Sequence, residues 1–126
     1  MTVLYYHIAE KSQFEAAQNG IYAPDAYEAE GFVHLCSAAQ LSGVYERYYK
    51  GRKGLVLLFI AFEQEDFLSR TLILEDLTNS GERFPHYYAP IPIQKIKGHH
   101  PLEPRDDDPL TLDKYFLSVI NKVSSL

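Results

Sequence analysis

Three histidines stand at points of the sequence where an imidazole could reach a ligand. His7, His34 and His86 each lie near the expected end of a strand or in a loop, with aromatic residues close by. Such a histidine can hydrogen-bond a ribose or a phosphate, exchange a proton near neutral pH, or bind a metal ion. For each one alone, a histidine hydrogen-bonded for structural reasons is the alternative. Their common placement favours a shared ligand site.

Ser37 follows His34 where the chain is expected to pass from a short strand into a helix. Ser37 and Gln40 have the Ser-x-x-Gln spacing of a capping box. The free N–H groups and the dipole of a helix N-terminus favour a negative charge. We therefore expect His34 and Ser37 to meet an anionic group of a ligand.

Other kinds of chemistry have weaker support. Cys36 is the single cysteine, and as a thiolate beside a helix start it would need His34 as its base. Pairs this close in sequence seldom form a catalytic dyad, so a cysteine enzyme is a minor alternative. The histidines have no His-x-x-x-His spacing, no cysteine pair and no carboxylate at ligand spacing, and no metal is expected.

Neither a P-loop nor a Gly-x-Gly-x-x-Gly motif occurs, which disfavours the common nucleotide-binding folds. Arg70 and Arg83 are candidate clamps for an anion, and an ordinary surface arginine is the alternative for both.

The elements that must position these residues follow from hydrophobic periodicity. Strands are expected at residues 3–8, 55–62, 71–74 and 91–96, and the continuous apolar run of 55–62 predicts burial on both faces. Helices are expected at 13–18, where Ser12 and Glu15 have capping-box spacing, from 38 to before Gly51, and at 112–123. The last of these is amphipathic.

The segments between these elements carry turn residues. Residues 21–30, 78–83 and 99–109 are expected to be irregular, with the aspartates at 106–108 in a solvated loop. Pro85 and Pro90 predict that residues 84–90 do not form a regular central strand.

Composition narrows the class of protein. The chain of 126 residues has the length of one domain, and 46% of its residues are hydrophobic. A net charge of −5 argues against binding a long nucleic acid, which needs a basic surface. No apolar run approaches the length of a membrane helix, and no targeting segment is recognised at the N-terminus, so a cytoplasmic protein without membrane contact is expected.

Three separated pieces of the sequence resemble one family. They are Tyr6-His7-Ile8 with Phe14-Glu15-Ala16-Ala17 and Gly20-Ile21-Tyr22, then Glu30-Gly31-Phe32-Val33-His34 with Ala38-Ala39-Gln40, then Gly81 with Phe84-Pro85-His86-Tyr87-Tyr88-Ala89-Pro90-Ile91. On these residues the chain resembles the bacterial domain-of-unknown-function family 952. Cys36 and Ala89 stand where that family usually has Ser and Gly. The resemblance makes residues 1–102 the family core of a single domain, 1–126, and leaves 103–126 as a loop and a C-terminal amphipathic helix.

The resemblance implies a compact relative of the ADP-ribosyltransferase fold, an α+β domain with split small β-sheets, a central cleft and flanking helices. In that fold the histidine of the first strand, here His7, contacts the adenosine ribose of NAD. The segment Val33-His34-Leu35 is similar to the His-Ile-His-Leu segment of RNA 2'-phosphotransferases, which share the fold. The third motif, where transferases often place a catalytic glutamate, falls at about His86 or Tyr87, and no glutamate stands there.

We therefore expect a cleft that binds NAD or another ADP-ribosyl or nucleotide compound. In it His7 would hold the ribose, His34 and Ser37 would meet the diphosphate, and His86 with Tyr87 would face the reacting sugar. Arg83 is a further candidate contact for the anion. If the chain is an enzyme, this predicts ADP-ribosyl or phosphoryl transfer with His34, His86 and Tyr87 as catalytic residues. The alternatives are a noncatalytic module that binds a metabolite or a protein, and a His-ligated metal hydrolase. No partner protein is predicted.

Overall fold

The computed structural model describes residues 1–103 and 109–124 and has a mixed α+β architecture. Its central sheet has three antiparallel strands in the order β1-β4-β8, which are β1 (Thr2–Glu10), β4 (Leu55–Glu63) and β8 (Ile96–Leu102). Residues 55–62 are all buried in the middle strand. The prediction of a strand covered on both faces is therefore confirmed.

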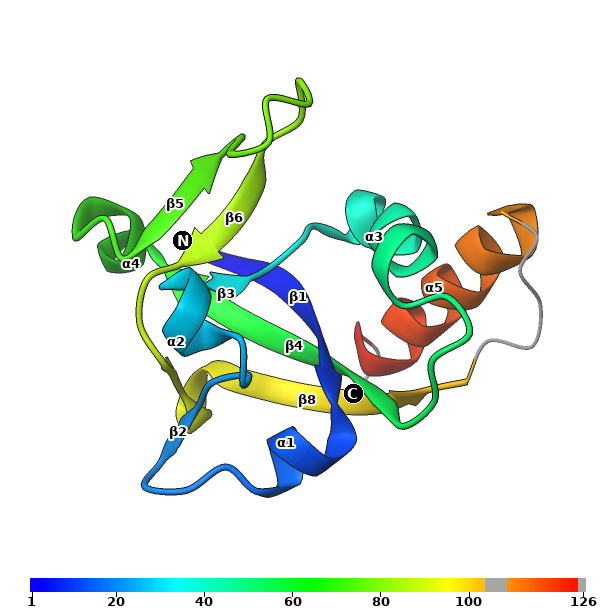
Figure 1. Ribbon diagram of the computed structural model, residues 1–126, viewed down its shortest axis with the longest axis horizontal. Coiled ribbons are helices and arrows are strands. Elements are labelled where there is room, and N and C mark those ends of the chain that lie inside the picture. The colour runs from blue at the N-terminus through cyan, green and yellow to red at the C-terminus, as the bar shows by residue number, and fades with distance from the viewer. Residues whose placement is uncertain (104–108, 125–126) are drawn as a thin grey trace.

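Two smaller sheets lie beside the central one (Figure 1). One has the order β3-β6-β5, with β3 (Val33–His34), β6 (Phe84–Tyr87) and β5 (Leu72–Glu75). The other pairs β2 (Ile21–Tyr22) with β7 (Ile91–Pro92). Just beyond β3, the N–H of Cys36 donates to the carbonyl of Tyr6 (2.9 Å) and the Tyr6 N–H donates back (2.8 Å). This bridge joins the chain after β3 to the edge strand β1.

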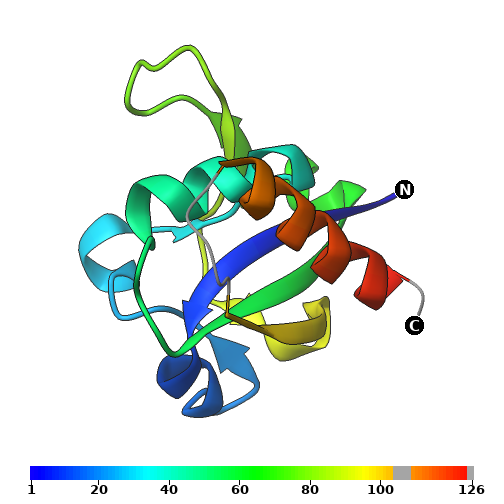
Figure 2. The ribbon, with the colours of Figure 1, turned by 90° about the vertical axis from the view of Figure 1, so that its right-hand side faces the viewer.

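Two longer helices cover one face of the central sheet, α3 (Leu41–Tyr48) and α5 (Pro109–Ser124), and they lie against each other in Figure 2. Apolar side chains of the helices and sheet form one core cluster there, which includes Tyr6, Leu57, Tyr45 and Phe116. The helix predicted between residue 38 and Gly51 and the amphipathic helix predicted at 112–123 are thus confirmed. None of the helices in the described part of the chain has the length and apolar character needed to cross a bilayer.

The opposite face of the central sheet packs on the smaller sheets. A second core cluster fills this space and includes Val33, Leu58, Phe62 and Tyr87. Because side chains alternate along a strand, Val33 of β3 and Tyr87 of β6 point into this core while their neighbours point out.

Short helical turns connect the strands. They are α1 (Lys11–Glu15), α2 (Tyr27–Glu30), the 3-10 turn η1 (Ala38–Gln40), α4 (Gln64–Leu68) and the 3-10 turn η2 (Ile93–Lys95). At η1 the Ser37 N–H donates to Gln40 Oε1 (3.0 Å), so the predicted capping box is confirmed. The helix predicted at 13–18 instead begins at Lys11, directly after β1. Glu10 holds the N-cap position, and the prediction that Ser12 caps the helix was wrong. Residues 21–30, predicted irregular, contain β2 and α2.

Pro85 corrects the prediction for residues 84–90. The first four of them, Phe84–Tyr87, form β6, which lies in the middle of its sheet despite the proline. The Pro85 carbonyl accepts from the N–H of Leu35 (3.0 Å). In an antiparallel pair the N–H and C=O of one residue face the same neighbour. The missing donor of Pro85 therefore faces the chain just after β3, where pairing ends at His34.

The expected strand at 91–96 and loop at 99–109 were also wrong in part. The chain makes the two-residue strand β7, turns through η2, and then runs as β8 to Leu102. Pro101, which lacks an N–H, is tolerated because β8 is an edge strand. The outer side of an edge strand pairs with no other strand and needs no hydrogen-bond donor. The aspartates at 106–108 lie outside the described residues.

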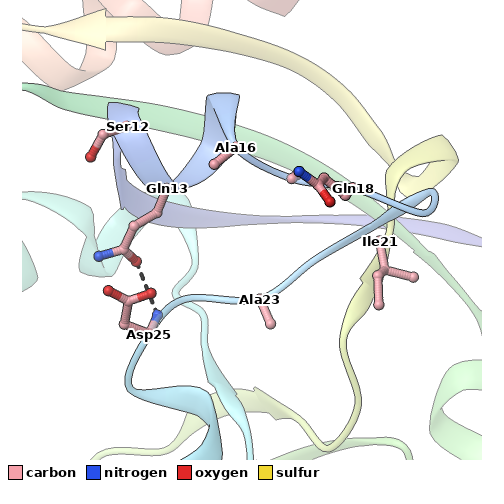
Figure 3. Close-up of a pocket in the computed structure, with 8 residues that line it drawn as sticks. Ser12, Gln13, Ala16, Gln18, Ile21, Ala23 and Asp25 are labelled. Atoms are coloured by element: carbon pink, nitrogen blue, oxygen red, sulfur yellow. Dashed lines mark hydrogen bonds between the residues drawn. The ribbon is translucent and has the colours of Figure 1, made fainter.

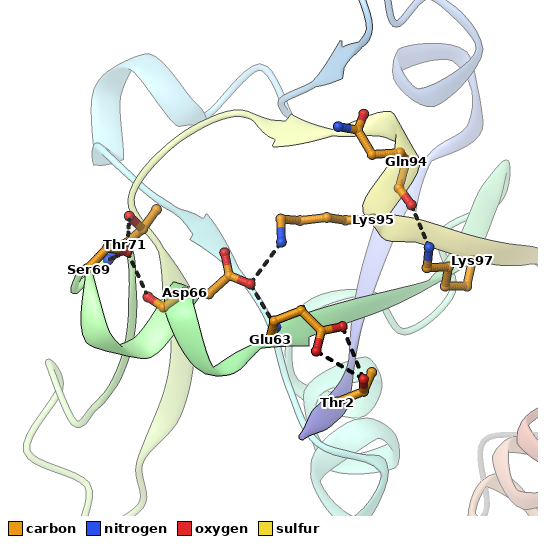
Figure 4. A network of polar contacts seen from close by, with 8 residues as sticks. All are labelled: Thr2, Glu63, Asp66, Ser69, Thr71, Gln94, Lys95 and Lys97. Carbon is orange, nitrogen blue, oxygen red and sulfur yellow. Dashed lines mark hydrogen bonds and ion pairs between the residues drawn. The ribbon is translucent and has the colours of Figure 1, made fainter.

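A polar network fastens η2 to the start of α4 (Figure 4). Asp66 Oδ2 accepts from the Glu63 N–H (2.8 Å) and from Lys95 Nζ (2.8 Å). Both charged side chains are largely buried. The pair therefore links two connections that are far apart in sequence.

Candidate functional site

His34 and His86 lie on the same outer face of the β3-β6-β5 sheet. They are paired directly across β3 and β6, and their ring centroids are 5.3 Å apart with planes at 85°. His34 is exposed, whereas His86 is only 5% exposed. The structure thus brings together two of the predicted site residues, in two different environments.

Each of these imidazoles has its own carboxylate. Glu30, the last residue of α2, pairs with His34 Nε2. Glu75, the last residue of β5, accepts from His86 Nδ1 at 2.9 Å, and the Tyr88 hydroxyl donates to the same Oε1 atom. A carboxylate partner orients an imidazole and decides which ring nitrogen carries hydrogen.

The protonation states follow from these contacts. Burial lowers the pKa of His86 and outweighs the opposing effect of the hydrogen bond to Glu75. Burial tends to raise the pKa of Glu75, but the hydrogen bonds from Tyr88 and His86 prevail, and its pKa is lowered. The bond to Glu75 raises the pKa of Tyr88 to about 12. At neutral pH the site therefore holds a carboxylate, a phenol and a neutral His86 imidazole.

Phe32 forms an aromatic wall beside both histidines. Its ring centroid lies 4.3 Å from that of His86 and 4.8 Å from that of His34. The Tyr88 ring is 5.2 Å away from Phe32. We call Glu30, Phe32, His34, Glu75, His86 and Tyr88 the paired-histidine face. Phe32 is nearly buried and shields its polar neighbours from water, whereas Tyr88 is exposed.

His7 lies on the inner side of the same segment. Its Nδ1 contacts the His34 carbonyl oxygen (2.6 Å) and its Nε2 contacts the Tyr22 hydroxyl (2.9 Å). A carbonyl only accepts, so Nδ1 carries the hydrogen and Nε2 accepts from Tyr22. Burial lowers the pKa of His7 to about 4. The three histidines therefore do not line one open cleft: His7 supports the backbone of His34 from within the core.

Tyr87 points away from His86. Its ring packs on Phe62 in the core (centroids 5.3 Å apart), and burial followed by the nearby Asp66 carboxylate raises its pKa. The expectation that Tyr87 and His86 face the same sugar is corrected, because consecutive strand residues point to opposite faces. Tyr88, the next residue, is the tyrosine that reaches the paired-histidine face.

Ser37 and Arg83 are brought together by Gln40. The Gln40 side chain accepts from the Ser37 N–H and donates to the Arg83 carbonyl (2.7 Å). Arg83 is exposed in the loop before β6, which projects from the body of the molecule in Figures 1 and 2. The charge of Arg70 contributes to the lowered pKa of Glu75.

Cys36 and metal chemistry receive no support from the described residues. The thiol of Cys36 is buried, and burial raises its pKa to about 12, so it is not a thiolate at neutral pH. Within residues 1–103 and 109–124, no group of three or more His, Cys, Asp or Glu residues is placed to hold a metal ion.

With this geometry in place, comparison with known proteins decides the family. A family model described as Protein of unknown function (DUF952) matches residues 8–99. The chain belongs to the DUF952 family. The match includes five of the six predicted site residues and begins one residue after His7. A search of curated proteins finds no match.

Solved structures of another protein are similar to this DUF952 chain. The X-ray structure of protein CC0527 from Caulobacter crescentus is 29% identical, with a TM-score of 0.71, and the match covers 83% of this chain and 90% of that chain. The solution NMR structure of CC0527 is 28% identical, with a TM-score of 0.69, covering 82% and 88%. CC0527 is a structural genomics target, so the likeness supports the fold and names no activity.

A pocket of about 350 Å³ lies away from the paired-histidine face, beside α1 (Figure 3). It is lined by Ser12, Gln13, Ala16, Ala17, Gln18, Ile21, Ala23 and Asp25. Gln13 Oε1 accepts from the Asp25 N–H across it (3.0 Å). None of the six predicted site residues of this DUF952 chain lines this pocket.

Four residues of the paired-histidine face were missed from the sequence: Glu30, Phe32, Glu75 and Tyr88. Phe32 and Tyr88 stand two residues from a histidine, a spacing that places side chains on one face of a strand. Glu30 stands four residues before His34. The sequence around Glu75 gives no indication that this residue belongs to the site, because Glu75 is brought to His86 only by the pairing of β5 with β6.

Proposed function

We propose that this chain binds a small nucleotide-like ligand, NAD or another ADP-ribosyl compound, at the paired-histidine face. We further propose that His34 and His86 exchange protons with that ligand during ADP-ribosyl or phosphoryl transfer. The observation that carries the proposal is the pair of facing imidazoles, each with a carboxylate partner. The likeness to the ADP-ribosyltransferase fold is part of this proposal.

The two imidazoles lie in different environments, which suits them to different roles in proton transfer. His34 is exposed, and its Nε2 is paired with the Glu30 carboxylate. His86 is buried and neutral, with burial lowering its pKa. Two neighbouring imidazoles, one exposed and one buried and neutral, can exchange protons with one ligand.

The surrounding groups fit the rest of such a ligand. Tyr88 is exposed and offers ring surface for an adenine or nicotinamide ring, and base stacking on an aromatic side chain contributes about 1–3 kcal/mol. Glu30 and Glu75 repel a phosphate, so an anion needs positive charge nearby to bind, and Arg70, whose charge contributes to the lowered pKa of Glu75, is a candidate source.

Calorimetric titration with NAD, ADP-ribose and AMP at pH 7.5 tests the proposal. We expect binding that weakens about tenfold in His34→Ala, the loss of roughly one hydrogen bond to the charged ligand. His99→Ala is the matched control, because His99 is exposed on β8, outside the paired-histidine face. Absence of heat with all three ligands at millimolar concentration would overturn the proposal.

Turnover is measured separately from binding. Chromatography of each ligand after incubation should show its consumption by the unmodified chain, and much slower consumption by His34→Ala. Binding without consumption would instead assign the face to a noncatalytic module.

A further inference from the structure

Glu75 receives two hydrogen bonds on one oxygen atom. His86 Nδ1 lies 2.9 Å from Oε1, and the Tyr88 hydroxyl contacts the same atom. An ionised carboxylate only accepts, so the hydrogen of this contact belongs to Nδ1 of His86. In a neutral imidazole the other nitrogen, Nε2, then carries the lone pair.

The Nε2 atom of His86 is left available for a ligand. Among the described residues it has no hydrogen-bond partner, since the contacts of His86 are the bond to Glu75 and ring contacts to Phe32 and His34. The described part of the chain also has no fully buried side-chain nitrogen or oxygen without a partner. Nε2 therefore reaches the surface, although the residue as a whole is nearly buried.

The neighbours of Nε2 limit what it can meet. The charged and titratable groups around the imidazole are Glu75 and Tyr88 on its Nδ1 side, and His34 with Glu30. An unprotonated nitrogen accepts a hydrogen bond and repels a bare phosphate oxygen. A hydroxyl group satisfies it, and a negative group bound next to that hydroxyl would lie toward His34.

We infer that Glu75 is a positioning residue that holds His86 as the proton acceptor of the site, with Nε2 receiving a sugar hydroxyl of the ligand. This inference rests on the proposed function for its ligand, and it adds which histidine accepts the proton and which group of the ligand it contacts. The chemical class is a phosphorylated sugar whose free hydroxyl lies beside its anionic group. In phosphoryl transfer, His86 would take the hydroxyl proton on Nε2 as the hydroxyl oxygen bonds to the phosphorus of that anionic group and the bond from phosphorus to the leaving oxygen breaks, with the electron pair going to that oxygen. The Nδ1–H bond to Glu75 would be kept throughout.

The tautomer of His86 can be measured without any ligand. Nitrogen-15 NMR of the unmodified chain at pH 7.5 should show His86 neutral, with hydrogen on Nδ1 and none on Nε2. Glu75→Ala removes the acceptor and should move the hydrogen largely to Nε2. Tyr88→Phe is the matched control, because it removes the other donor to Glu75 but leaves the carboxylate, and its His86 should keep the Nδ1–H form.

Two NMR results would overturn the inference. One is hydrogen on Nε2 in the unmodified chain, a measurement that does not depend on whether Glu75→Ala folds. The other is a shift of the tautomer in Tyr88→Phe as large as that in Glu75→Ala.

Titration with ADP-ribose tests the ligand contact. Glu75→Ala should weaken binding about tenfold, whereas Glu28→Ala, which removes an exposed carboxylate from α2, should leave it unchanged. Equal affinity of the unmodified chain and Glu75→Ala would overturn the contact of Nε2 with the hydroxyl. No binding by the unmodified chain would overturn the proposed function and this contact together, while the NMR result would still decide the role of Glu75.

Discussion

The buried imidazole of His7 makes the free energy of unfolding of this protein depend on pH. Burial lowers its pKa from 6.5 to about 4 in the folded chain, whereas in the unfolded chain the ordinary value applies. Between these two values the unfolded chain binds a proton that the folded chain does not. The free energy of unfolding therefore falls as pH falls, by about 1.4 kcal/mol per pH unit and about 3 kcal/mol over the whole window.

The measurement is urea unfolding followed by circular dichroism, at intervals from pH 7.5 to pH 4. The unmodified chain is compared with His7→Asn, whose amide can still donate to the His34 carbonyl but does not titrate. We expect the variant to be less stable at pH 7.5 by about 1–3 kcal/mol, because the Tyr22 hydroxyl loses its acceptor. Its stability should decline less between pH 6.5 and pH 4 than that of the unmodified chain.

Carboxylates also change stability over this range, so the difference between the two slopes is the quantity that matters. His99→Asn removes an exposed histidine and should keep the slope of the unmodified chain. Equal slopes for the unmodified chain and His7→Asn would refute the reasoning, since His7 would then titrate alike in the folded and unfolded states.

Two further predictions concern the core. Iodoacetamide at pH 8 should label Cys36 on the order of a hundredfold more slowly in the folded chain than in urea, because the buried thiol has a pKa raised to about 12; comparable rates would show that the thiol is accessible. Asp66→Ala should lower the free energy of unfolding by about 2–4 kcal/mol, since Lys95 and the Glu63 N–H both lose their acceptor. Lys97→Ala, at an exposed position, should change it by less than about 0.5 kcal/mol, and a similar cost for both variants would contradict this account.

The elements with strong local patterns could be predicted from the sequence. The continuous apolar run of β4 and the helical spacing of apolar residues in α3 and α5 reflect burial that each segment shows by itself. The role of Pro85 could not be predicted in this way. Whether a proline fits a central strand depends on which neighbour its missing N–H faces, and that is set by the pairing of β6 with β3.

The candidate site could also be predicted only in part from the sequence. That His34 and His86 share a site could be inferred, because both follow strand-like residues. The choice of Tyr87 over Tyr88 failed because residues 84–90 were not expected to form a strand, and without a strand the alternation of faces cannot be applied. The burial of His7 could not be predicted from the sequence, because it depends on how the strands pack. The His7 imidazole reaches from β1 to the carbonyl of His34 inside the folded chain.

Side chains alternate between the two faces of the sheet along β3 and β6. The pairing register of these two strands therefore determines both which residues enter the core and which form the paired-histidine face. Val33 pairs with Tyr87 on the inner face, and His34 pairs with His86 on the outer face. A slip of one residue in one strand would turn its core residue out and its histidine in. The hydrogen bonds from His7 to the His34 carbonyl and from Leu35 to the Pro85 carbonyl oppose such a slip. His7 thus affects the geometry of the histidine pair from within the core, so substitutions there should disturb the site even though its own imidazole meets no ligand.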